Sequence, residues 1–340
     1  MEVNQPIHRV KIILYRLKQW KNHLLPPVIA SMLASFPFSS SSVDDYWKGF
    51  YWFASLFCIS VYGYWVNDWS DRDADLRAGK PNFLIGLTPI PLFLGAIFFT
   101  GSALLLWLLG HPPIVTSILF ILEWVCFTLY CLPVIRLKNN PILGPLCDTH
   151  YTHILPVLFT ILFFLEHLPL EIIICLYLLL LMKGIRNILL HQVDDRKTDK
   201  EDGLYTFPIR FGPLYTIRLI NRIFLPLETL SIVVLLLLTL PFSYIPITCF
   251  SIFILLYGAF LSIWHTKYIG SSIIKHFLYF MNDLYEFWLP YIVILSIHIK
   301  WELKLLLLLV YALLFTKSIK SIYKVIRKSF NNFTNLLLSH

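Results

Sequence analysis

The sequence predicts an all-α membrane protein that crosses the bilayer nine or ten times. Composition is the first observation behind this prediction: of 340 residues, 57% are hydrophobic and 14% are charged. A soluble protein would carry about 25% charged residues. The second observation is a mean hydropathy of +0.70. The third is that apolar runs of about 20 residues, the length that spans a bilayer, recur along the chain.

Ten apolar runs mark the expected helices in chain order. The last two runs are short, so they form either two tight spans or one long bent span. No segment is long and polar enough for a soluble domain, and we expect a single integral-membrane domain over residues 1–340, with a basic cytosolic leader at 1–21 and a basic tail at 317–340. The runs cover residues 22–38, 49–66, 89–109, 113–132, 142–165, 169–190, 224–241, 245–265, 285–299 and 302–316.

The placement of basic residues predicts the orientation. With ten spans and a cytosolic N-terminus, all of the 28 Lys and Arg residues except Lys48, Lys300 and Lys304 fall in cytosolic segments. The net charge of +8 matches such segments beside an anionic leaflet and gives no support to nucleic-acid binding. We therefore expect a protein of a bacterial inner or plasma membrane, surrounded by membrane lipids, with its N-terminus and active site facing the cytosol.

The segment that follows the second run carries the strongest chemical signal. Asp68, Asp71 and Asp75 lie at spacings of three and four residues, so on a helix their carboxylates share one face. Like charges stacked in this way repel each other, and a positive charge is expected among them. Mg²⁺ is suited to this place, because it takes oxygen ligands and is usually held by one or two carboxylates together with substrate phosphates.

A second acidic motif comes later in the chain, again directly after an apolar run and before a glycine. Between the motifs, Arg136 and Lys138 flank a turn on the same expected face. A guanidinium and an ammonium at this place could bind a diphosphate, although the same pair would also serve as an ordinary membrane anchor. Two facing motifs predict bridging Mg²⁺ and a phosphorylated ligand, and a solvated acidic helix is the alternative. The second motif comprises Asp195, Asp199 and Asp202.

Three patterns occur in a fixed order, and each closes an apolar run: N-D-x-x-D-x-x-x-D, Y-x-x-P-x-x-R-x-K and D-x-x-x-D-x-x-x-G. In this order they resemble the UbiA-type membrane prenyltransferase superfamily, from about Arg16 to the last spans. The resemblance implies nine transmembrane helices around a central cavity open to the cytosolic side. It also implies Mg²⁺-dependent transfer of a prenyl group from a polyprenyl diphosphate to an aromatic or other lipophilic acceptor, which attacks the allylic cation left by the departing diphosphate.

The resemblance assigns roles to individual residues as well. It implies that Tyr130 lies near the reacting carbon and that Arg16, Lys18 or Lys21 contacts the acceptor. Two departures from the family pattern stand out, namely the tenth apolar run and the residues just before the second motif. The implied diphosphate contacts are Asn67, Arg136 and Lys138, and the implied metal ligands are Asp68, Asp71, Asp75, Asp195 and Asp199.

Three further ionisable residues are candidates because charged groups in a membrane are costly. Glu123 lies in the middle of a run, where it would polarise the acceptor or take its proton, or else form a helix–helix hydrogen bond. Asp148 lies near the cytosolic end of the next run, and it would help bind metal or acceptor, or else bond a neighbouring helix. His191 adjoins the second motif, as a general base near neutral pH or as a structural residue.

Three other functions remain open. A membrane terpene cyclase of the same superfamily would use the same chemistry but quench the cation internally, so its product would form without an acceptor. A phosphoribosyl-transferring member is suggested slightly by the string Gln19 to Asn22. A transporter would place its charged sites near the bilayer midplane, whereas the carboxylates here cluster at the expected cytosolic edge.

Overall fold

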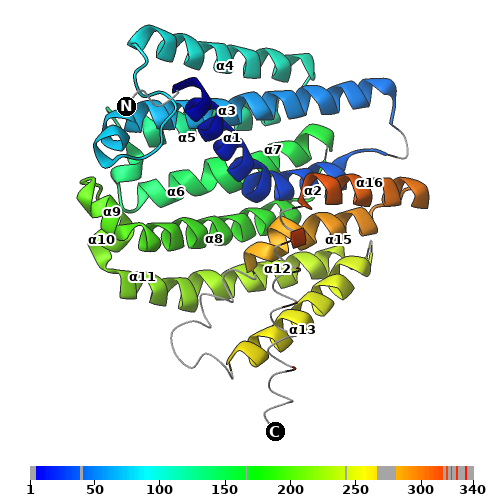
Figure 1. Cartoon of the computed structure of the whole chain (residues 1–340). Helices are drawn as coiled ribbons and strands as arrows, with labels where there is room; N and C mark the ends of the chain where they lie inside the picture. The colour runs from blue at the N-terminus through cyan, green and yellow to red at the C-terminus, as the bar shows by residue number, and fades with distance from the viewer. Residues whose placement is uncertain are drawn as a thin grey trace. The chain divides into compact units, whose positions relative to one another are not determined.

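The computed structural model describes residues 5–38, 41–165, 167–241, 243–265 and 281–316, together with residues 319, 320, 323, 327 and 334. Within this part of the chain every regular element is a helix, which confirms the predicted fold class (Figure 1). Most of the predicted basic tail, 317–340, lies outside the described residues.

The helices follow the predicted runs closely, because long apolar stretches end at the prolines, glycines and polar turns that separate them. In chain order they are α1 Gln5–Gln19, η1 Trp20–Leu24, α2 Leu25–Ser35, α3 Val43–Ala78, α4 Pro89–Leu109, α5 Ile114–Cys131, η2 Leu137–Asn139, α6 Leu143–Thr149, η3 His150–Ile154, α7 Leu155–Phe164, α8 Leu170–Asp194, α9 Arg196–Glu201, α10 Phe207–Phe211, α11 Pro213–Leu219, η4 Ile220–Phe224, α12 Leu225–Thr239, α13 Ile245–His265, η5 Leu284–Trp288, α15 Leu289–Ser296 and α16 Trp301–Leu314.

Five stretches of the described residues are long and apolar enough to cross a membrane. The predicted runs 285–299 and 302–316 form separate helices, α15 and α16, with a break after Ser296. The total of nine or ten crossings stays a prediction. The five stretches are Pro89–Leu109, Ile114–Cys131, Leu143–Phe164, Leu170–Asp194 and Pro213–Thr239.

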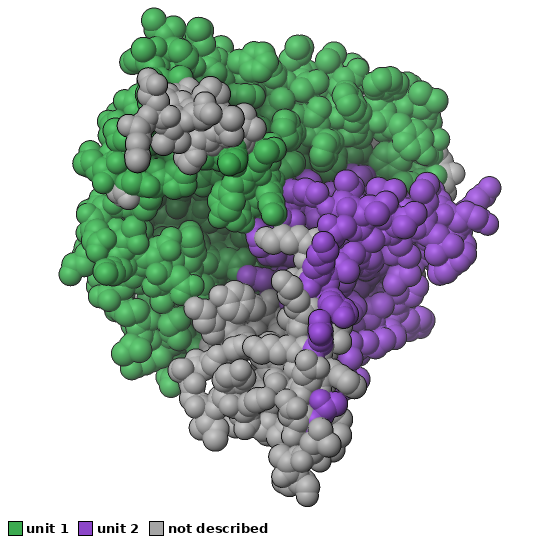
Figure 2. All heavy atoms as spheres, viewed as in Figure 1, with its two compact units in different colours: residues 1–20, 35–234 green, residues 21–34, 235–340 purple. Residues whose placement is uncertain are grey.

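The chain divides into two compact units, coloured separately in Figure 2. Unit 1 consists of residues 1–20 and 35–234, and it contains every residue predicted for the site. Unit 2 consists of residues 21–34 and 235–340. Within unit 2 an ion pair joins the two parts of the sequence.

In that ion pair, His23 Nδ1 lies 2.8 Å from Glu286 Oε2. The Tyr311 hydroxyl donates to the Glu286 backbone carbonyl at 3.4 Å. Phe253 of α13 and Trp288 of η5 form an edge-on aromatic contact, with ring centroids 6.3 Å apart. These contacts tie α13, η5 and α16 of unit 2 to the short segment that precedes α2.

The long helix α3 positions the first acidic motif. It begins at a capping box, in which the Ser42 hydroxyl accepts from the Asp45 backbone N–H and the Asp45 carboxylate accepts from the Ser42 N–H. It ends at Gly79, whose φ of +66° is a left-handed conformation that favours glycine. Its neighbour α4 packs closely, since a β-carbon at Gly95 would overlap the Trp65 ring.

A second close approach holds α8 against the helix formed by α6 and η3. Gly184 of α8 lies directly on the buried side chains of Thr149 and His153, and a β-carbon there would overlap both. Small residues allow such close crossings in membrane bundles. This crossing brings the helix that leads to the second motif next to the one that carries Asp148.

We expect Gly184→Ala to destabilise the protein by about 1–3 kcal/mol, because overpacking of this kind forces neighbouring side chains out of place. The thermal unfolding midpoint of the detergent-purified protein would report the loss. Gly101→Ala is the matched control, because nothing lies within 4 Å of a β-carbon at that α4 position. Equal midpoints for the two variants would contradict the tight crossing.

Candidate active site

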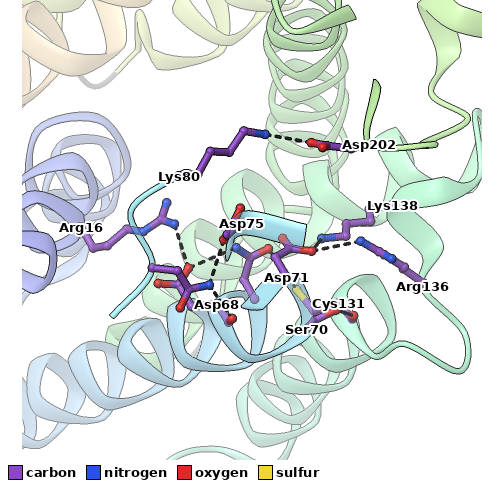
Figure 3. A network of polar contacts seen from close by, with 12 residues as sticks. Arg16, Asp68, Ser70, Asp71, Asp75, Lys80, Cys131, Arg136, Lys138 and Asp202 are labelled. Carbon is purple, nitrogen blue, oxygen red and sulfur yellow. Dashed lines mark hydrogen bonds and ion pairs between the residues drawn. The ribbon is translucent and has the colours of Figure 1, made fainter. Parts of the chain in front are cut away.

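The last turns of α3 carry the first motif, and its first carboxylate is fully buried. Arg16 of α1 donates to Asp68 Oδ1 at 2.7 Å. The Arg16 guanidinium also lies 5.8 Å from the centre of the Tyr64 ring. The predicted acceptor contact Arg16 is therefore paired with the first carboxylate of the motif (Figure 3).

The second carboxylate of the motif meets the predicted basic pair. Asp71 Oδ1 accepts from Arg136 Nη2 at 3.1 Å and also from Lys138 Nζ. Arg136 has a φ of +44°, a left-handed conformation that is uncommon outside glycine, and Lys138 lies buried in the short helix η2. The turn between α5 and α6 thus brings both cations to one carboxylate oxygen, as Figure 3 shows.

The third carboxylate is held by the loop after α3. Asn82 Nδ2 donates to Asp75 Oδ2 at 2.8 Å and to the Asp68 backbone carbonyl at 2.7 Å. Asn82 Oδ1 in turn accepts from the Leu84 backbone N–H at 3.0 Å. Sequence reasoning missed Asn82, although an amide just beyond the glycine that ends the motif helix was a usable signal.

The second motif lies on the short helix α9 and its two end residues, and not on α8. α8 ends at Asp194, and Asp195 stands at the junction with α9, with φ −89° and ψ 0°. Aspartate is a preferred residue at a helix start, which favours this division. The Asp199 backbone N–H still donates to the Asp195 carbonyl at 2.9 Å, and Gly203, with φ +71°, ends the segment as Gly79 ends α3.

Lys80 connects the loops of the two motifs. Its Nζ lies 2.8 Å from Asp202 Oδ2 (Figure 3). The hydrogen bond to Asp202 raises the pKa of the Lys80 ammonium above its usual value, and Asp75 and Asp195 add to the effect. The Lys80 ammonium therefore interacts electrostatically with carboxylates of both motifs. Sequence reasoning missed this residue as well.

The carboxylates of the site are electrostatically strained. Burial raises the pKa of Asp68 to about 6, although Arg16 opposes the shift. Burial and the neighbouring Asp195 raise the pKa of Asp199. In addition, Asp68 Oδ2 is buried and has no hydrogen-bond partner within the described part of the chain. Mg²⁺ would bind this free carboxylate oxygen and reduce the repulsion between the neighbouring carboxylates.

The carboxylates do not form a complete metal cage. Among the described residues, no group of three or more His, Cys, Asp or Glu side chains lies close enough to hold a metal ion. Mg²⁺ commonly binds through one or two carboxylates and completes its shell with water and substrate phosphates. The arrangement therefore suits a cation that arrives with a phosphorylated ligand.

Aromatic side chains of α5 and η3 meet beside the basic turn. The Tyr130 and Tyr151 ring centroids lie 5.3 Å apart, and those of Phe127 and Tyr151 lie 4.2 Å apart. The Tyr151 hydroxyl donates to Asp148 Oδ1 at 2.6 Å. Two predicted residues, Tyr130 and Asp148, are thus linked through Tyr151, which the sequence reasoning did not single out even though it lies three residues after Asp148.

The other predicted residues occupy different surroundings. His191 Nε2 lies 3.5 Å from Asp195 Oδ2, and its side chain is 70% exposed. Asn67 Nδ2 points to Asp68 Oδ1 at 3.5 Å, and its Oδ1 lies 3.7 Å from the thiol of Cys131. Glu123 is fully buried, and its Oε2 has no hydrogen-bond partner among the described residues.

Comparisons with known proteins show the family of the chain. A sequence model described as the UbiA prenyltransferase family matches residues 24–284. No curated protein sequence matches the chain. Solved structures do match, at sequence identities low enough that they show likeness of fold alone.

Two of these structures illustrate the likeness. A UbiA homolog from Archaeoglobus fulgidus bound to GPP and Mg²⁺ has a TM-score of 0.59 and 16% identity, and the match covers 84% of this chain and 99% of that one. A structure of digeranylgeranylglyceryl phosphate synthase has a TM-score of 0.58 and 18% identity, and the match covers 86% of this chain and 99% of that one.

Proposed function

The chain belongs to the UbiA prenyltransferase family, and on that premise we propose that it transfers a prenyl group from a polyprenyl diphosphate to an aromatic or other lipophilic acceptor, with Mg²⁺ as cofactor. It is an integral membrane protein with several apolar helices. Members of the family transfer prenyl groups, and the Archaeoglobus fulgidus homolog was solved with GPP or DMAPP and Mg²⁺.

One observation carries the proposal. Residues from three separate segments of the sequence meet in one polar network, in which Asp71 accepts from both Arg136 and Lys138 (Figure 3). Neighbouring Asp68 keeps a buried oxygen that no described residue hydrogen-bonds. Carboxylate oxygens next to a guanidinium and an ammonium are the groups needed to bind a metal diphosphate.

Each group of residues has a place in the proposed reaction. Asp68, Asp71 and Asp75, with Asp195 and Asp199, would hold the cation, which when bound would neutralise charge on the departing diphosphate. Arg136, Lys138 and Asn67 would bind the diphosphate oxygens. Tyr130 would present its ring to the prenyl carbon, where cation–π attraction stabilises positive charge. Arg16 and Glu123 would face the acceptor, and His191 would accept a proton at the mouth of the site.

The proposal includes an orientation and a cavity. Lys and Arg residues concentrate in the segments on the side of the two motifs, which supports a site that faces the cytosol. We place the reaction in a central cavity that opens to that side, inside a bundle of nine or ten spans.

The test is an incubation of the purified, lipid-reconstituted protein with geranyl, farnesyl and geranylgeranyl diphosphates. Each would be run with Mg²⁺ or EDTA, and with or without a panel of phenols and quinone precursors. We expect diphosphate release that requires both Mg²⁺ and an acceptor, with a product heavier by one prenyl group.

Two results would contradict the proposal. Release without an acceptor, giving a hydrocarbon or terpene alcohol, would identify a cyclase. No release with any donor would instead favour the phosphoribosyl-transferring alternative or a carrier.

A further inference from the structure

A carboxylate stands inside one of the candidate spans without a basic partner. Asp148 belongs to the stretch Leu143–Phe164 and is partly buried. Within the described residues it forms no ion pair, whereas Asp71 is paired with two cations and Glu228 with Arg186. Ionisable groups at this depth are costly and commonly mark the path of a ligand.

Hydrogen bonding uses only part of this carboxylate. Tyr151 donates to Asp148 Oδ1 at 2.6 Å. Asp148 Oδ2 is not among the buried side-chain atoms that lack a partner, and the residue keeps solvent-accessible surface. One oxygen is therefore anchored by a phenol, and no described residue hydrogen-bonds the other, which is accessible to accept a further hydrogen bond.

Aromatic contacts connect Asp148 to Tyr130, the residue proposed to face the prenyl carbon. Tyr151, which holds the carboxylate, packs against Tyr130 and Phe127 with centroid separations of 5.3 and 4.2 Å. His191, beside the second motif, is near enough to interact electrostatically with Asp148. Asp148, on α6, is thus linked to Tyr130 through the ring of Tyr151.

We propose that Asp148 binds the acceptor, and that the acceptor presents a hydroxyl group at this point and no carboxylate or phosphate. The inference rests on the proposed prenyl transfer and names the class of its second substrate. An anionic acceptor group at this point would meet a like charge that no ion pair neutralises within the described residues, which costs affinity. A hydroxyl would instead donate to the free carboxylate oxygen, which is a charge-assisted hydrogen bond.

The bonds that change are few. The bond between the prenyl C1 and the diphosphate oxygen breaks, and its electron pair leaves with the diphosphate. A lone pair of the acceptor oxygen forms the new bond to C1. The hydroxyl proton passes to the Asp148 carboxylate, which returns it to water when the product departs. Tyr151 is a positioning residue in this step, because it orients the carboxylate.

The experiment measures binding as well as turnover. Full-length protein in lipid nanodiscs is loaded with Mg²⁺ and geranyl S-thiolodiphosphate, a donor that does not react. Binding of 4-propylphenol and of 4-propylbenzoate is then compared at pH 7.5 by calorimetry. We expect the wild type to prefer the phenol by about tenfold or more, since like charges repel in a low-dielectric site.

Two variants separate a binding role from a structural one. Asp148→Asn keeps the shape and removes the charge, so we expect the preference to fall to about threefold or less. It should also slow transfer to hydroxyl acceptors by about 10²-fold or more, the usual contribution of a positioned base. Tyr151→Phe keeps the charge and the ring, so the preference should survive. Glu171→Gln, at the exposed start of α8, is the control and should match the wild type.

Each outcome decides the matter. An unchanged preference in Asp148→Asn, equal losses in both variants, or failure of 4-propylphenol to bind the loaded wild type would overturn the role of Asp148. Failure of the donor analogue itself to bind would overturn the proposed function, and this inference with it. Normal donor binding by Asp148→Asn would show that the variant is folded.

Discussion

Replacing Asp71 by asparagine is expected to abolish turnover, with a loss of at least about 10³-fold, or ~4 kcal/mol of transition-state stabilisation. The carboxylate is the shared acceptor of Arg136 and Lys138, and it is one of the proposed metal ligands. Asparagine keeps the shape but removes the charge that holds both the cation and the basic pair. Diphosphate release from a prenyl diphosphate in proteoliposomes would measure the loss, and the variant should remain folded in the membrane.

Asp73 provides the matched control on the same helix. Its side chain is 72% exposed and contacts its sequence neighbour Arg72 at 3.1 Å, away from the network around Asp71. We expect Asp73→Asn to keep turnover close to the wild type. Full activity in Asp71→Asn, or in Asp68→Ala, would remove the basis of the metal assignment.

The second large effect concerns stability. Arg186 and Glu228 form a fully buried pair, with Nε to Oε2 at 2.6 Å and Nη2 to Oε1 at 3.0 Å. Removing the guanidinium takes both of these charge-assisted hydrogen bonds from the buried Glu228 carboxylate, so Arg186→Leu is expected to cost about 3–5 kcal/mol. The free energy of unfolding in mixed micelles would report it.

A double-mutant cycle makes this prediction specific. Because the penalty comes from removing only one half of a buried pair, Arg186→Leu combined with Glu228→Leu should recover most of the loss. Losses that simply add would show that the pair is not coupled. The exposed pair of Lys48 and Asp45, 4.0 Å apart, is the control, and Lys48→Ala should change stability by less than about 1 kcal/mol.

Some features of the site were readable from the sequence. The spacing of Asp68, Asp71 and Asp75 predicted one helical face, and α3 carries all three. The glycines that follow the two motifs were recognised as a shared feature, and both adopt a left-handed conformation. The length of an apolar run and the helical spacing of its residues are local properties, so they do not depend on how the rest of the chain packs.

Other features could not be read in this way. Asn82 and Lys80 sit in a loop whose path depends on what it packs against, and no period marks them. The second motif directly follows an apolar run, but a separate short helix, α9, carries it, because α8 ends just before Asp195. Tyr151 gained a role only because its ring meets those of two α5 residues.

Features that depend on neighbouring residues can be predicted from the sequence, whereas contacts between distant residues cannot. By itself the sequence determined the helical class, the apolar runs, the acidic and basic segments and the family they resemble, because each depends on neighbouring residues. Only the tertiary structure decided which cation meets which carboxylate. Arg16 and Asp68 are 52 residues apart, and Asp71 is 65 and 67 residues from Arg136 and Lys138. Contacts over such separations arise from helix packing, which no local pattern records.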